Sequence, residues 1–270
     1  MALLQNEEVL EPLRSLYPDV EFQVVTVRTQ GDINPEAPLA SMGLGIFVNE
    51  IERQLLQGDL DMAVHSLKDM PTKLPEGLAL GAILRRKDPR DVLVNRWQCP
   101  MAELPVGARI GTSSPRRSAQ LKNLCPQATV LPIRGNVETR LQKAIGAAYD
   151  GAVLAAAGLL RLGMSEHVAA YLSPQRFVPP PGQGALAVEV REDDDQMVNL
   201  LRAIDHIDTR LAVTAERAFL EKLGKGCQVP VGAYARCQGE LMLMTVFICS
   251  PDGEKAFRAK LEGLTLDPLQ

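Results

Sequence analysis

The chain has 270 residues, 46% of them hydrophobic and 23% charged, which is the composition of an ordinary globular protein with room for two or three domains. Its net charge of −4 argues against a general nucleic-acid-binding role, and no apolar run is long enough to span a membrane. The first residues lack the features of a signal peptide, and the five cysteines are scattered without a C-x-x-C pair. We therefore expect a cytoplasmic protein in a reducing compartment, without a metal site.

The first part of the chain alternates helix and strand. The hydrophobic pattern predicts helices over 7–16 and 46–57, and strands over 20–27, 60–64 and 78–84. This order is typical of an α/β domain with a largely parallel sheet, in which ligands sit beyond the carboxyl ends of the strands. Ser66, Lys68 and Asp69 follow one such strand. The adjacent lysine and aspartate indicate either a surface ion pair or an anion anchor beside an acid.

After a charged break at 85–91, the same alternation begins again. The pattern predicts strands over 92–94, 108–110, 129–133 and 152–155, and helices over 115–124 and 137–148. Ser114 is a good N-cap for the first of these helices, and Pro115 suits its first position. Arg116 and Arg117 then fall in the first turn, where the helix dipole is already positive. They either bind an anion or point into water.

Arginine recurs where strands end in this part of the chain. Arg134, Arg140 and Arg161 follow two further strands, within a chain of net negative charge. The guanidinium group suits bidentate capture of carboxylate or phosphate. Neither G-x-x-x-x-G-K-[ST] nor G-x-G-x-x-G is present, so a ligand with several carboxylates is favoured over a nucleotide.

The last third of the chain changes in character. The Pro- and Gly-rich segment 177–185 suits a crossing between domains, and two crossings in an α/β pair resemble the hinged, two-lobed plan of anion-binding proteins. A strand over 185–190, a helix over 209–223 and an antiparallel meander over 229–236, 241–249 and 254–261 are expected. Cys227 lies between the helix and the meander, flanked by glycine and near two lysines. It is either a reactive thiol or an inert loop cysteine.

Seven segments, in one order along nearly the whole chain, resemble the porphobilinogen deaminase (hydroxymethylbilane synthase) family. They are HSLKDMP (65–71), DPRD (88–91), GTSSPRR (111–117), IRGN (133–136), AGLLRL (157–162), PGQGA (181–185) and GCQVP (226–230). The resemblance implies a transferase of tetrapyrrole (haem and porphyrin) biosynthesis. Such an enzyme joins four porphobilinogen molecules head to tail into hydroxymethylbilane, with release of ammonia.

The resemblance also implies a cofactor and a set of site residues. A dipyrromethane primer is attached through a thioether to Cys227, and Asp69 is the catalytic carboxylate that stabilises the cation formed when ammonia leaves. The residues implied to hold the cofactor are Ser66, Lys68, Thr112, Ser113, Ser114, Arg116, Arg117 and Gly135. Those implied to serve the substrate or the growing chain are Arg134, Arg140, Arg161 and Gln183. A monomer acting on porphobilinogen, without nucleic acid or membrane partners, is expected.

The implied fold is two periplasmic-binding-protein-like α/β domains with hinge crossovers, plus a small α+β domain with a three-stranded antiparallel sheet. We expect domain 1 over 1–84 and 185–202, domain 2 over 92–178 and domain 3, which carries the cysteine loop, over 208–270. The family's first strand, its usual lysine near 43–47 and its C-terminal helices are not matched, so the resemblance predicts a chain truncated at both ends. Two alternatives stay open: a non-catalytic two-lobed anion-binding protein and an inactive remnant of the family.

Overall fold

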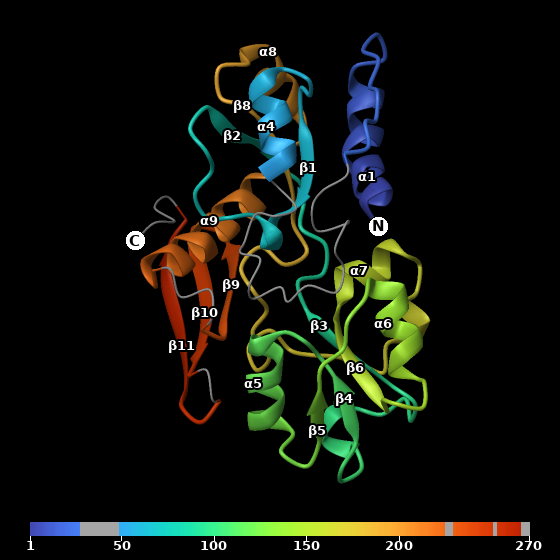
Figure 1. Ribbon diagram of the computed structural model, residues 1–270. Helices are drawn as coiled ribbons and strands as arrows, with labels where there is room; N and C mark the ends of the chain where they lie inside the picture. Colours follow the sequence, from blue (N-terminus) through green and yellow to red (C-terminus); the bar gives the residue numbers. More distant parts are fainter. Residues whose placement is uncertain (28–48, 225–228, 251–252, 266–270) are drawn as a thin grey trace. The chain divides into compact units, whose positions relative to one another are not determined.

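The computed structural model describes residues 1–27, 49–224, 229–250 and 253–265 (Figure 1). The chain divides into two compact units. The first unit is Met1–Arg86 with Ala185–Leu211, and the second is Lys87–Gly184 with Ala212–Gln270. Each unit therefore combines two separate stretches of the chain. The division into three domains stays a prediction, because residues 212–270 are grouped here with the second α/β part.

The first unit is a three-stranded sheet with helices on both faces. Its elements are α1 (Ala2–Leu16), α4 (Asn49–Gln57), β1 (Ala63–Ser66), β2 (Leu78–Ile83), β8 (Leu186–Arg191), α8 (Asp195–Leu201) and the 3₁₀ helices Leu67–Asp69 and Arg202–Ile204. Helices α1 and α8 pack on the face that carries Val188 and Val190. On the other face, Leu55 of α4 packs with Ala63 and Leu78. The sheet thus fixes the end of β1, where the first predicted site residues lie.

Two sequence predictions for this unit are wrong. The sheet is not largely parallel, because β8 lies between β1 and β2 and is antiparallel to both. Hydrophobic patterns do not encode the direction in which a strand enters after a long crossover. Residues 20–27 form no strand, although they alternate, and Val24 and Val25 are 39% and 53% exposed. An alternating sequence forms a strand only where the edge of a sheet supplies hydrogen-bond partners for its backbone. Within the described residues, no strand pairs with residues 20–27.

The second unit contains a five-stranded mixed sheet. Its elements are β3 (Asp91–Asn95), β4 (Arg109–Gly111), α5 (Pro115–Leu124), β5 (Thr129–Leu131), α6 (Val137–Ala144), β6 (Gly151–Ala155), α7 (Ala156–Arg161), β7 (Ala170–Tyr171) and the 3₁₀ helices Met101–Glu103 and Ser165–His167. The strand order is β5-β4-β6-β3-β7, with β4 parallel to its two neighbours and β3 antiparallel to its two. Leu93 packs with Leu121 of α5, whereas Val92 and Val94 pack with Leu141 of α6. Helices therefore cover both faces.

The C-terminal part is one long helix and a small sheet. Its elements are α9 (Ile207–Lys222), β9 (Val231–Gln238), β10 (Leu241–Cys249) and β11 (Ala256–Leu264). The strands form an antiparallel sheet in the order β11-β10-β9, and Phe247 of β10 packs with Ala119 of α5 and Val178. The predicted fold class, two α/β parts with a small three-stranded antiparallel sheet, is confirmed. Across the described stretches, no helix has the length and apolar character needed to cross a membrane.

Candidate functional site

The end of β1 carries the first group of predicted site residues. Ser66 is the last residue of the strand, and Lys68 and Asp69 lie in the 3₁₀ helix that follows. Leu67 anchors this turn, because its side chain is buried and its N–H donates to the carbonyl of Ala185 at 3.1 Å. Lys68 is half-buried and Asp69 is exposed. The sheet thus holds the backbone while the catalytic candidate Asp69 faces solvent.

Ser66 has a side-chain partner that the sequence did not indicate. The amide nitrogen of Gln5 in α1 donates to the Ser66 hydroxyl at 2.8 Å. The two residues are far apart in the chain, so only the packing of α1 against the sheet brings them together. Next to Ser66, the buried His65 ring lies 3.0 Å from the carboxylate of Glu189. This buried pair ties β1 to β8 next to the turn in the sequence.

The second group of predicted site residues surrounds the start of α5. The Ser114 hydroxyl caps the helix and accepts the N–H of Arg117 at 3.4 Å, as the sequence predicts. Thr112 is buried, and its hydroxyl accepts the N–H of Ser114 at 3.2 Å. The Ser113 hydroxyl donates to the carbonyl of Ile133 at 2.7 Å and accepts the N–H of the same residue at 3.1 Å. These hydroxyls therefore fix the loop from which the helix begins.

Arg116 and Arg117 do not point into water. Their exposed fractions are 5% and 7%, and both guanidiniums pair with Asp91, which is completely buried at the start of β3. Arg116 approaches one carboxylate oxygen at 2.8 Å, and Arg117 approaches the other at 2.7 Å. Arg116 also donates to the carbonyl of Val178, and Arg117 to that of Val153. Of the two alternatives that the sequence left open, an anion or water, the structure has an anion, and that anion is a residue of the chain itself.

Gln183 completes what we call the Asp91 cluster: Asp91, Arg116, Arg117 and Gln183. The Gln183 side chain is 1% exposed, and its amide donates to Asp91 at 3.0 Å and to the carbonyl of Pro89 at 2.9 Å. Burial raises the pKa of Asp91, but the two guanidiniums and the amide outweigh it and lower the pKa to about 2. Sequence reasoning did not single out Asp91. It lies in the segment DPRD (88–91) that carries part of the family resemblance, at the head of the apolar strand 92–94, but neither signal gave it a role.

Two further predicted arginines lie near the start of α6. Gly135 has a φ of +120°, and the side chain of Arg140 donates to its carbonyl at 2.6 Å. Asn136 caps the helix by accepting the N–H of Thr139 at 2.8 Å. Arg134 is exposed and Arg140 is half-buried. The structure thus brings Arg134, Gly135 and Arg140 to one helix start, which is an arrangement suited to an anion.

Arg161 and Cys227 complete the predicted set. Arg161 ends α7, is half-buried, and lies 3.5 Å from the carbonyl of Gly184. Cys227 lies outside the described residues, between the end of α9 and the start of β9. Those two elements are joined by Glu216 of α9, whose buried carboxylate accepts the N–H groups of Gly182 and Ala235, each at 2.7 Å. This carboxylate therefore links α9 to β9, the two elements between which Cys227 lies in the sequence.

The remaining cysteines agree with a packing role. Cys125 and Cys249 are buried, Cys99 and Cys237 are half-buried, and none of these four described cysteines forms a disulfide. Burial raises the pKa of the Cys125 thiol and so disfavours its reactive thiolate. No group of three or more His, Cys, Asp or Glu side chains in the described ranges is placed to hold a metal ion.

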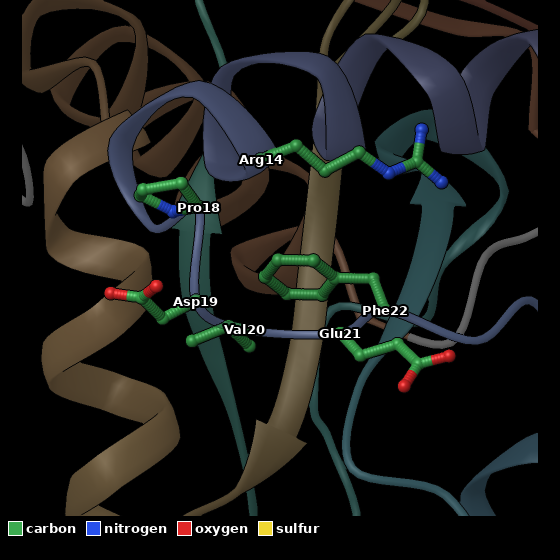
Figure 2. Close-up of a pocket in the computed structure, with 6 residues that line it drawn as sticks. All are labelled: Arg14, Pro18, Asp19, Val20, Glu21 and Phe22. Carbon is green, nitrogen blue, oxygen red and sulfur yellow. The ribbon is translucent and has the colours of Figure 1, made fainter.

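A surface pocket in the first unit contains none of the predicted site residues. Figure 2 shows its lining, which comprises Arg14, Pro18, Asp19, Val20, Glu21 and Phe22. The guanidinium of Arg14 is paired with Glu7 at 2.9 Å. Two carboxylates on the wall of a pocket repel an anionic ligand, so we do not assign the predicted polycarboxylate ligand to it.

Comparison with known proteins gives matches along almost the whole chain. A family model described as the porphobilinogen deaminase dipyrromethane cofactor binding domain matches residues 1–199, and the model of the porphobilinogen deaminase C-terminal domain matches residues 210–268. The two models leave only short stretches unmatched.

Curated relatives named porphobilinogen deaminase agree with these models. The chain is 44% identical over 264 residues to the protein of Desulforamulus reducens, a match that covers 97% of this chain and 85% of the relative. It is 46% identical over 265 residues to the protein of Geobacillus kaustophilus, covering 97% and 86%. Among solved structures, the methionine-binding protein MetQ has a TM-score of 0.46 at 11% identity, over 74% of this chain and 84% of that one.

Proposed function

The chain belongs to the porphobilinogen deaminase family, whose members join four porphobilinogen molecules into hydroxymethylbilane with release of ammonia, and we propose which of its residues perform that reaction. The matched family model is that of a dipyrromethane cofactor binding domain, so dipyrromethane is the cofactor. When bound, it supplies the primer to which the first substrate is joined. We propose Cys227 as the attachment point, since a thiolate is the strong nucleophile that a thioether link needs.

The observation that supports this proposal best is the excess of positive charge in the Asp91 cluster. Two buried guanidiniums face one buried carboxylate, which leaves one positive charge without a partner in the cluster. Dipyrromethane carries acetate and propionate arms, and a carboxylate arm is the group that such a charge attracts. Arg116 and Arg117 would hold an arm, and Thr112, Ser113, Ser114 and Gly135 would line the same part of the second unit. The residues present thus fit the cofactor.

In the first unit, we propose roles for Ser66, Lys68 and Asp69. The amine of Lys68 would hold a further carboxylate arm, as would the Ser66 hydroxyl by hydrogen bonding. The exposed Asp69 carboxylate would accept the pyrrole N–H of porphobilinogen and stabilise the positive charge that develops as ammonia leaves. A carboxylate on a fixed turn suits this role, because it needs no reorganisation when the charge appears.

The incoming substrate brings two more carboxylates at each addition. We propose that Arg134, Arg140 and Arg161 bind these arms, since each offers the planar fork that carboxylates favour. Gln183 would also serve the substrate, as the member of the Asp91 cluster whose amide donates a hydrogen bond to Asp91. We further propose a monomeric, cytoplasmic enzyme without nucleic-acid partners, which agrees with its small-molecule substrate and its net charge of −4.

Replacing Asp69 tests the catalytic proposal. We expect Asp69→Ala to lower the rate of porphobilinogen consumption by about 10²-fold or more, as is typical when a group that stabilises a developing charge is removed. Asp59→Ala is the matched control, because Asp59 is also an exposed aspartate of the first unit. If Asp69→Ala consumes porphobilinogen at the parent rate, the proposed role of Asp69 is wrong. A parent chain that binds porphobilinogen without consuming it would favour a non-catalytic anion-binding protein or an inactive remnant.

A further inference from the structure

The Asp91 cluster places two like charges together in a dry part of the second unit. Arg116, Arg117 and Asp91 are at most 7% exposed, so water screens their interactions weakly. The charges that act on the Arg116 guanidinium are those of Asp91, which favours the cation, and Arg117, which disfavours it. Two positive charges and one negative charge leave the cluster with one positive charge.

Other features of the cluster also oppose its arginines. Both lie in the first turn of α5, where the positive end of the helix dipole disfavours a cation. Burial in addition lowers the pKa of Arg116. Arg116 donates a hydrogen bond to the backbone carbonyl of Val178, and Arg117 donates one to that of Val153, but a carbonyl carries no net charge. Asp91 is therefore the group that allows the two guanidiniums to lie side by side.

Asp91 is itself rigidly held. It is the first residue of β3, where it pairs in register with Ala155 of β6. One of its oxygens accepts from Arg117 and from the amide of Gln183, and the other faces Arg116. The carboxylate thus has a fixed position from which it sets the position of both guanidiniums.

We propose that Asp91 is a positioning residue that holds Arg116 and Arg117 together before the cofactor is attached, and leaves one positive charge for a cofactor carboxylate. This inference rests on the proposed function of the chain. Under this proposal, the carboxylate of Asp91 and a carboxylate of the cofactor are two negative charges that stabilise the same two arginines. Asp91 should therefore contribute more to the stability of the chain when the cofactor is missing, and the cofactor should contribute more when Asp91 is missing.

A charge-neutral variant in two cofactor states tests the proposal. Asp91→Asn is prepared in the full chain and in the Cys227→Ala background, which cannot carry the covalent cofactor, and urea unfolding is followed for both. We expect the loss of urea midpoint caused by Asp91→Asn to be roughly twice as large without the cofactor as with it, because two unscreened guanidiniums then face each other. Equal losses in the two states would mean a structural role only, and would overturn the proposal.

Asp150→Asn is the matched control. Asp150 also lies between two arginines of the second unit, at 2.9 Å from Arg109 and 3.4 Å from Arg96, but the side chains of both arginines are about 40% exposed. Its midpoint loss should be the same in both cofactor states. The midpoint comparison requires that Asp91→Asn carries the cofactor, which its intact mass shows. If Asp91→Asn folds but does not load the cofactor while Asp150→Asn loads it, the loss of loading takes the place of the midpoint comparison and supports the proposal.

Two further measurements cover the other outcomes. If Asp91→Asn does not fold, Asp91→Asn with Arg117→Gln returns the cluster to one positive charge and should fold. Failure of this double variant to fold would overturn the charge argument.

If the parent chain carries no cofactor, the proposed function fails at loading, and the Asp91 proposal is tested with sodium phosphate against sodium chloride at equal ionic strength. Phosphate should then raise the midpoint of Asp91→Asn more than that of the parent, and equal rises would refute the proposal.

Discussion

Acid should weaken the second unit through Asp91 in a predictable way. The pKa of this carboxyl falls from its ordinary value of 3.8 to about 2 in the folded chain. A folded-state pKa below the unfolded value gives stability that is present above pH 4 and is lost as the pH falls toward 2. The difference between the pKa of Asp91 in the unfolded chain and in the folded chain corresponds to about 2 kcal/mol of unfolding free energy, of which about half is lost by pH 3.

The difference between the parent chain and Asp91→Asn isolates this contribution from those of other carboxylates. At pH 6 the variant leaves two buried guanidiniums without their counter-ion, which should cost about 3–5 kcal/mol. Urea unfolding of both chains at pH 6, 4 and 3 should show this difference shrinking by about 1 kcal/mol at pH 3. If the two free energies of unfolding fall in parallel over this range, Asp91 is not the low-pKa anion of the cluster.

Two other substitutions give further predictions. Burial and the nearby charge of Glu189 raise the pKa of Glu52 above its ordinary value, so the stability that its protonated form contributes is lost as the pH rises through the raised pKa. Glu52→Gln stays neutral and should flatten this decline of the urea midpoint with rising pH, and an unchanged slope would contradict the assignment. Gly135→Ala should destabilise the chain by about 1–3 kcal/mol in thermal unfolding, because the φ of Gly135 is +120° and the new Cβ would lie 2.6 Å from Thr139. The control Gly163→Ala, at a φ of +67° with open space around it, should lose less stability in the same assay. Equal losses of stability would refute the steric argument.

Local signals in the sequence were sufficient for the start of α5. Ser114, Pro115 and the apolar spacing that follows predicted both the helix and its cap, and the structure has the helix over the same residues. The two arginines in its first turn indicated either an anion or exposure to water, and the structure has an anion there. The identity of one such anion could not be predicted, because Asp91 lies on another strand and only the pairing of β3 with β6 brings it under the helix.

Features that depend on pairing over long distances were missed. The antiparallel placement of β8 between β1 and β2 depends on how the chain returns to the sheet after about 100 residues. The hydrophobic pattern of residues 185–190 predicts a strand but not the direction in which that strand runs. The alternating segment 20–27 lacks a pairing edge among the described residues, so its pattern was misleading. The bond from Gln5 to Ser66 likewise joins elements that no local motif connects.

The central claim, that this chain is a dipyrromethane-carrying porphobilinogen deaminase with its cofactor on Cys227, is tested most directly by intact mass. The purified chain and Cys227→Ala are measured side by side under denaturing conditions, in which only covalent additions remain. We predict that the parent chain carries the added mass of two linked pyrrole units and that Cys227→Ala does not. A bare mass for a folded parent chain, or the same added mass on both chains, would contradict the claim.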